Sequence, residues 1–236
     1  NASEFYRAEN GQPIGYFWGY KTAGIFQNTQ EIDEWRAVGN GILQSNVQPG
    51  DVRFVDRNHD GQINDKDKVN LGNGTPDFTL GLNLGFVYKG FDFSIVANGA
   101  FGQQIVQSYR NHTRPTPNYT TAILDRWHGE GTSNRIPRVT DSNINYQFSD
   151  LFIQNGDYLR LSTLTLGYDF AKLFKGKAVS QARLYFQVQN LFTITGYDGM
   201  DPEIGFGSSN NSWVSGLDYG YYPRPRTVLV GVNLKF

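Results

Sequence analysis

The chain has 236 residues, a formal net charge of −1 and no cysteine, and its mean hydropathy is −0.48. The absence of cysteine excludes disulfides and thiol catalysis, and the near-zero charge gives no electrostatic argument for nucleic-acid binding. No apolar run approaches the roughly 20 residues of a membrane helix, whereas 27 glycines, 14 tyrosines and 17 phenylalanines favour a β-rich protein with many turns.

A two-residue alternation of apolar and small or polar side chains predicts strands along the chain. Between residues 79 and 88, every even position is leucine, phenylalanine or tyrosine, while glycine, asparagine and threonine occupy most odd positions. Half-exposed strands have this period and helices do not. The ranges that show it are 14–24, 79–88, 91–102, 159–170, 182–195 and 226–236.

The length and chemistry of these strands favour a membrane barrel over a soluble sandwich. A tilted strand needs about 9–11 residues to cross the hydrocarbon layer, whereas soluble strands average about 5–6 residues. The polar face suits a wet lumen, and aromatic residues such as Tyr88, Tyr168 and Phe236 lie at strand ends, where lipid interfaces favour them. We expect an all-β fold, namely the C-terminal strands of a large antiparallel transmembrane β-barrel with long extracellular loops.

The connections between the strands alternate between short and long. Residues 89–90 and 171–181 are the short ones, and barrels of this class place short turns in the periplasm and long loops outside. Counting back from Phe236 puts the long connections on the extracellular side; these are 25–78, 103–158 and 196–226. Six strands cannot close around a lumen, so we expect the chain to be a piece of a larger barrel, either a fragment or one part of a nicked protein.

One loop has the spacing of a calcium site. It places side-chain oxygens at its first, third and fifth positions, glycine at its sixth, a backbone carbonyl at its seventh and an acid at its twelfth. The predicted ligands of a structural Ca²⁺ are Asp56, Asn58, Asp60, Gln62 and Asp67. The alternative is a metal-free turn held by hydrogen bonds of its Asp and Asn side chains.

The sequence gives little support for catalysis. The acid pair Asp201 and Glu203 has glycosidase-like residue types, but acids in turns are usually only solvated, and we expect no enzyme. An aromatic loop has residue types that suit ligand contact, but for any single residue of it packing against neighbouring loops is slightly favoured. Amides on the lumen face are further candidates for ligand contact. The candidate contact residues are Asn98, Gln187, Gln189, Trp213, Tyr219, Tyr221 and Tyr222.

Several longer motifs together resemble one family. They are Pro49-Gly-Asp-Val-Arg-Phe-Val-Asp-Arg-Asn-His-Asp-Gly, Leu71-Gly-Asn-Gly-Thr-Pro-Asp-Phe, Tyr158-Leu-Arg-Leu-Ser-Thr-Leu-Thr-Leu-Gly-Tyr, Gln189-Asn-Leu-Phe-Thr and Tyr222-Pro-Arg-Pro-Arg-Thr. This combination is similar to the C-terminal third of SusC/RagA-type TonB-dependent transporters of Bacteroidota, over essentially the whole chain.

The resemblance implies a bacterial outer-membrane barrel of roughly 22 strands and the partners that such a barrel needs. They are an upstream plug and the remaining strands, a SusD-like surface lipoprotein as a lid, the TonB complex acting through an upstream segment, and the outer-membrane lipid. The family imports oligosaccharides or oligopeptides without altering them. Two other hypotheses are a soluble calcium-stabilised β-rich module that binds carbohydrate, and a surface glycoside hydrolase.

Overall fold

The computed structural model describes residues 5–36, 41–108, 119–173, 179–204 and 215–236. They form two compact units. The sheet unit contains residues 75–104, 155–204 and 221–236, and the loop unit contains residues 1–74, 105–154 and 205–220. Among the described residues, no helix has both the length and the apolar character that crossing a membrane requires.

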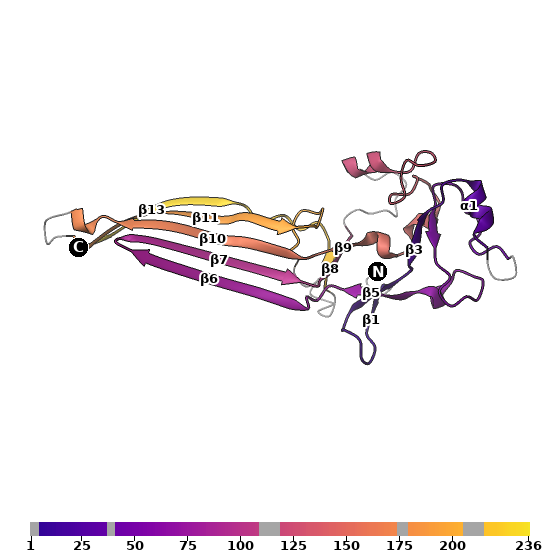
Figure 1. The fold of residues 1–236 in the computed structure, drawn as a ribbon, viewed down its shortest axis with the longest axis horizontal. Coiled ribbons are helices and arrows are strands. Elements are labelled where there is room, and N and C mark those ends of the chain that lie inside the picture. Colours follow the sequence, from indigo (N-terminus) through magenta and orange to yellow (C-terminus); the bar gives the residue numbers. More distant parts are fainter. Residues whose placement is uncertain (1–4, 37–40, 109–118, 174–178, 205–214) are drawn as a thin grey trace. The chain divides into compact units, whose positions relative to one another are not determined.

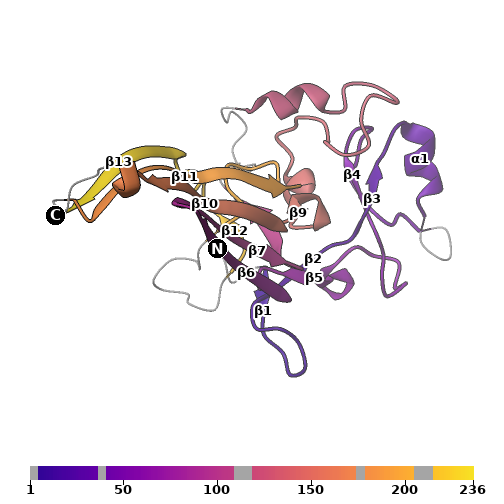
Figure 2. The ribbon, with the colours of Figure 1, turned by 60° about the vertical axis from the view of Figure 1, so that its left-hand side comes forward.

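The sheet unit is built around one five-stranded antiparallel sheet (Figures 1 and 2). Its order is β13-β11-β10-β7-β6. The strands lie within a residue or two of five of the predicted ranges: β6 Phe78–Tyr88, β7 Phe91–Phe101, β10 Tyr158–Asp169, β11 Gln181–Thr195 and β13 Thr227–Lys235.

The register of this sheet aligns the apolar positions of all five strands. Two of the rows that cross it are Leu84-Ile95-Leu164-Val188-Val228 and Phe86-Phe93-Leu166-Phe186-Val230. Since side chains alternate between the two faces of a strand, both rows lie on one face. Much of this face is open, and Leu166 on the central strand is 50% exposed. An apolar surface of this kind marks contact with lipid or with another protein.

The opposite face is polar over most of its area. Between the two apolar rows, Ser94, Thr165 and Gln187 are aligned on β7, β10 and β11. Leu229 continues this row on β13 and is an apolar exception. The sheet therefore has one apolar and one largely polar face, the arrangement of a strand layer between lipid and a wet lumen.

A β-bulge keeps the two faces distinct along β10. Leu159 and Leu161 lie at odd positions, whereas Leu164 and Leu166 lie at even ones. The register shifts between Leu161 and Thr163 against both neighbouring strands. One extra residue in a strand reverses the side-chain alternation beyond it, so the shift returns the later leucines to the apolar face.

The short connection between β6 and β7 is a tight turn. Lys89 and Gly90 have φ values of 47° and 93°, and two consecutive positive φ angles are typical of the type I′ turn that matches strand twist. Aromatic rings gather at this end of the strands: the ring centroids of Phe91 and Tyr168 lie 4.4 Å apart, and those of Tyr168 and Phe170 lie 4.6 Å apart. This position suits the aromatic girdle of a membrane barrel.

The loop unit has three small sheets. They are β1-β2-β5, with strands Tyr6–Arg7, Tyr16–Gly19 and Val69–Asn73; β3-β4, with strands Thr22–Ile25 and Val52–Phe54; and β12-β8-β9, with strands Leu217–Asp218, Gln104–Gln107 and Ile153–Asn155. The first residue of β8 and the last residue of β9 are assigned to the sheet unit. The α-helix α1 spans Thr29–Glu34 and lies beside β3 (Figures 1 and 2). The described 3₁₀ helices are Asp65–Asp67, Thr121–Asp125, Asn143–Tyr146 and Asp150–Phe152, with Ala171–Leu173 in the sheet unit.

The loop unit has its own core. One buried cluster consists of Tyr6, Phe17, Leu71, Val106 and Leu217. A second consists of Tyr20, Val52 and Phe54, with Ile63 and Leu151 packed against it. The described parts of the long connections are therefore folded and bury apolar side chains.

The predicted strand over 14–24 is wrong as a single half-exposed strand. The structure divides this range into β2 and β3, which belong to different sheets. The alternation puts Ile14, Tyr16, Trp18 and Tyr20 on one apolar face. Ile14 is 69% exposed, whereas Phe17, which lies on the opposite face, is 0% exposed. Both faces of β2 are needed for the core of the loop unit, so the alternation does not report membrane contact here.

An added charge should lower the free energy of unfolding much more on the apolar face of β10 than on its polar face. In the full receptor, Leu164→Arg would place a guanidinium on the apolar face near the middle of β10, where lipid exposure near the midplane costs about 2–4 kcal/mol. Thr165→Arg is the matched control, because it adds the same group to the adjacent residue on the polar face. Urea titration of folding into lipid vesicles measures both free energies of folding. An equal loss for the two variants would contradict the assignment of the faces.

Candidate functional site

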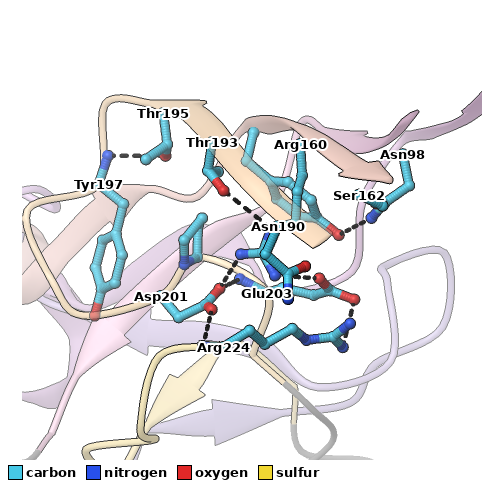
Figure 3. A network of polar contacts seen from close by, with 12 residues as sticks. Asn98, Arg160, Ser162, Asn190, Thr193, Thr195, Tyr197, Asp201, Glu203 and Arg224 are labelled. Atoms are coloured by element: carbon cyan, nitrogen blue, oxygen red, sulfur yellow. Dashed lines mark hydrogen bonds and ion pairs between the residues drawn. The ribbon is translucent and has the colours of Figure 1, made fainter. Parts of the chain in front are cut away.

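A buried arginine organises the polar face of the sheet unit at the end away from the Lys89-Gly90 turn. Arg160 of β10 is aligned with Asn98 of β7 and Thr193 of β11. Its side chain, 3% exposed, donates from Nη2 to Asp201 Oδ1 at 2.6 Å and from Nη1 to Glu203 Oε2 at 2.9 Å. Nε donates to Thr193 Oγ1 at 3.0 Å (Figure 3). All three bonds fix the guanidinium against the sheet.

The two acids connect Arg160 to a second arginine. Asp201 Oδ1 accepts the backbone N–H of Glu203 at 2.9 Å, and Asp201 Oδ2 accepts that of Arg224 at 3.2 Å. Glu203 Oε1 pairs with Arg224 Nη2 at 2.8 Å (Figure 3). Two arginines thus balance two acids, and the network holds the segments on either side of 205–220 together at the polar face.

These contacts assign a structural role to Asp201 and Glu203. A glycosidase needs one carboxyl group that donates a proton and a second that attacks or stabilises. Here, both carboxylates accept hydrogen bonds from guanidinium groups, and charge-assisted bonds of this kind are among the strongest in proteins. The pair therefore holds chain segments in place.

The predicted amide contacts share the polar face with Arg160. Asn98 Nδ2 lies 3.3 Å from the hydroxyl of Tyr158, and Asn98 Oδ1 accepts from the hydroxyl of Ser162, so this amide is engaged within the protein (Figure 3). Gln187 is half-buried and Gln189 is exposed. The register places both glutamines on the same face as Asn98. Their contact with a ligand stays a prediction.

The predicted aromatic contacts are divided. Tyr221 and Tyr222 belong to the sheet unit and Tyr219 to the loop unit, while Trp213 lies outside the described residues. Tyr222 is 86% exposed. The structure thus brings two of these four residues into the unit that carries the polar face.

A second ion pair crosses the polar face nearer the Lys89-Gly90 turn. Arg183 of β11 pairs through Nε with Asp92 Oδ1 of β7 at 2.7 Å, although β10 lies between these strands. Gly167 of β10 makes room for the pair, because a Cβ there would lie 2.3 Å from Asp92 Oδ1. The sequence analysis missed both Arg160 and Arg183. Each is a charged residue inside an alternating strand, and this pattern could have indicated an ion pair.

The predicted metal loop is held by its own acids. Asp56 Oδ2 accepts the N–H of Gly61 at 2.9 Å, and Asn58 Oδ1 accepts that of Asp60 at 2.9 Å. Asp60 Oδ1 accepts the N–H of Gln62 at 3.1 Å. The Asn58 and then the Asn64 side chains, as donors, hold the pKa of the Asp60 carboxyl below its ordinary value. These are the turn contacts of the metal-free alternative, and a folded metal loop also needs them.

Asp67 closes this loop. Its Oδ1 accepts the N–H of Arg57 at 2.8 Å, and its Oδ2 accepts that of Asn64 at 2.8 Å. Ile63 anchors the loop against Tyr20 in the second core cluster. Burial, and then the charges of Asp65 and Asp67, raise the pKa of Tyr20 to about 12. Within the described residues, no group of three or more His, Cys, Asp or Glu side chains is placed to hold a metal.

The chain is similar in sequence to named receptors. It is 34% identical to the TonB-dependent receptor P3 of Formosa agariphila over 237 residues. The aligned region covers 96% of this chain and 22% of that protein. It is 31% identical over 197 residues to the TonB-dependent receptor SusC of Bacteroides thetaiotaomicron, covering 83% of this chain and 18% of that protein. No protein-family model matches the chain.

The fold is similar to that of solved transporters. The RagAB peptide transporter matches with a TM-score of 0.67 and 20% identity over 98% of this chain and 24% of that chain. The RagAB peptide importer in its closed-closed state matches with a TM-score of 0.67 and 21% identity, over 98% of this chain and 25% of that chain.

The two-faced antiparallel sheet thus has the fold of one part of a transmembrane β-barrel like those of the RagAB structures. The sequence relatives confirm the family that the motifs predicted: the chain is a segment of a SusC/RagA-type TonB-dependent receptor. It spans 18–26% of the length of the curated relatives that it matches.

Removing the Arg160 side chain tests the role of the network. In the full receptor, Arg160→Met leaves the buried Asp201 without its guanidinium, and breaking a buried pair from one side costs about 3–5 kcal/mol. We expect faster protease cleavage within residues 196–226. Arg36→Met is the control, because it removes an exposed i,i+3 pair with Asp33 worth about 0–1 kcal/mol. Equal cleavage in Arg160→Met and wild type would exclude this role for the network.

Proposed function

We propose that this chain forms part of the lumen wall and of the outward-facing end of an outer-membrane importer. The importer would take up oligosaccharides or oligopeptides whole, under a SusD-like surface lipoprotein, with energy from the TonB complex. The plug, the remaining strands and the TonB-contacting segment would be supplied by other parts of the receptor.

The observation that carries this proposal is the two-faced sheet. One face exposes rows of leucine, valine and phenylalanine, and the other aligns serine, threonine and glutamine. In a membrane barrel, the apolar face would contact lipid and the polar face would contact water in the lumen. A soluble carbohydrate-binding module would instead leave the apolar rows in water, where exposed patches of this kind cause association.

The polar face supports an uncharged, polar cargo. Gln187 and Gln189 carry amides, which both donate and accept hydrogen bonds, and the described arginines of this face pair with acids. Amides suit sugar hydroxyls and peptide groups equally. RagAB is named as a peptide importer, which supports the peptide alternative, while the lumen chemistry favours neither.

Transport by glutamine variants tests this proposal. In a strain that depends on this receptor, Gln187→Leu combined with Gln189→Leu removes two polar contacts of about 1 kcal/mol each. The sum of about 2 kcal/mol corresponds to a fall in uptake of roughly 30-fold, measured at equal amounts of receptor in the outer membrane. Growth on an oligosaccharide mixture or on a peptide digest as sole carbon source identifies the cargo class.

Phe186→Leu is the matched control, because Phe186 neighbours Gln187 but lies in an apolar row. Unchanged uptake in the glutamine variant would remove these residues from the cargo path. If a strain that lacks the receptor grew as well as wild type on both carbon sources, the import proposal would be overturned for these cargoes.

A further inference from the structure

One carboxylate oxygen of the Asp56–Asp67 loop is buried without a hydrogen-bond partner. Asp56 is 9% exposed, and its Oδ1 accepts no hydrogen bond, although its Oδ2 accepts the N–H of Gly61 across the loop. A buried unpaired acceptor costs about 1–3 kcal/mol, and more when it is charged. Native structures satisfy such groups with protein, water or an ion, so Oδ1 marks a position for a ligand within the loop.

Further oxygens are available around the same turn. Asn58 and Asp60 place side-chain oxygens two and four residues after Asp56, and Gln62 follows with its backbone carbonyl. Gly61, with a φ of 84°, makes the sharp bend that this spacing requires. Among the ion pairs of the described residues, none involves Asp56, Asp60 or Asp67. The acids at the predicted ligand positions are therefore not neutralised by a basic side chain, whereas Asp65, outside those positions, pairs with Lys68 at 2.7 Å.

Asp67 has a different role from Asp56 and Asp60, because both of its oxygens are used in hydrogen bonds that close the loop. It is fully buried, and its carboxylate accepts N–H groups from both ends of the loop. These bonds keep the loop closed whether or not an ion is present. The ligand set that remains is mixed, consisting of the Asp56 and Asp60 carboxylates, the Asn58 amide oxygen and the Gln62 carbonyl. Such a set does not require three acids to converge.

We propose that this loop binds a hard divalent cation, Ca²⁺, with Asp56 Oδ1 as a direct ligand and Asp67 mainly as the closing residue of the loop. An all-oxygen set of carboxylates, amide and carbonyl is the chemistry that Ca²⁺ selects. Because Ile63 packs against Tyr20, Val52 and Phe54, the ion also stabilises the core of the loop unit. This inference does not depend on what the receptor transports.

Calcium titration of the full receptor tests the assignment. The receptor is stripped with EGTA in detergent and titrated with CaCl₂ by calorimetry, with a dissociation constant expected at about 10⁻⁴–10⁻³ M, the extracellular range. We expect Asp56→Asn to bind one ion fewer per chain than wild type. Asp65→Asn, which changes the same charge in the same loop outside the ligand positions, keeps the ion. Equal calcium stoichiometry in wild type and Asp56→Asn would overturn the proposal.

Protease protection of the wild-type receptor covers the case in which Asp56→Asn does not fold. At a free calcium concentration about 100 times the dissociation constant, opening of the loop falls about 100-fold. Cleavage within residues 56–68, mapped by mass spectrometry, should slow by the same factor relative to EGTA. Cleavage at the same rate with and without calcium would exclude the ion.

Discussion

The structure of the sheet unit depends on the register that keeps apolar side chains on one face of all five strands. A one-residue slip between any two strands would move a whole apolar row to the polar face. The bulge near Ser162 shows how strictly this holds, because Leu161 and Leu164 lie three residues apart and still share a face. Backbone pairing in lipid adds a second constraint, since every N–H and C=O group there needs a partner within the protein.

The same register determines what the polar face can carry. Large or charged side chains fit there only beside small ones, and glycines supply the space. Gly167 lies under the pair of Asp92 and Arg183, and the ring of Tyr185 lies against Gly231, where a Cβ would come within 2.3 Å of it. Asp92 pairs with Arg183 on this face, and Arg160 pairs with Asp201 and Glu203, so these charges are balanced locally. This local balance of charge is one reason for the proposal of a neutral, polar cargo.

The sequence predicted those parts of the fold that local alternation controls. Residues 79–88 and 226–236 alternate strictly, and Lys89-Gly90 between two such runs has the chemistry of a tight turn. The range 14–24 has a similar pattern for another reason: Tyr16 and Phe17 are adjacent and both buried in the loop unit. Alternation cannot distinguish a strand in lipid from a short strand with core on both faces. Tertiary contacts decide that, and they are not local.

The polar network was beyond the sequence analysis for the same reason. Arg160, Asp201 and Arg224 are far apart along the chain, and their pairing depends on how the segments after β11 and before β13 return to the sheet. The metal-type loop is different, because all its predicted ligands lie within twelve consecutive positions and spacing alone is enough to predict it. The structure added the one fact that spacing could not supply, the unpartnered oxygen of Asp56.

The central claim is that the five-stranded sheet crosses the membrane with its leucine and valine rows in lipid. Spin labels placed one at a time at residues 79–88 of the full receptor in lipid vesicles test it most directly. The account predicts that collisions with oxygen, which is concentrated in lipid, are highest at even positions, and that collisions with a water-soluble nickel chelate are highest at odd positions. Equal accessibility at neighbouring positions, or high nickel collision rates at Leu82, Leu84 and Phe86, would contradict it.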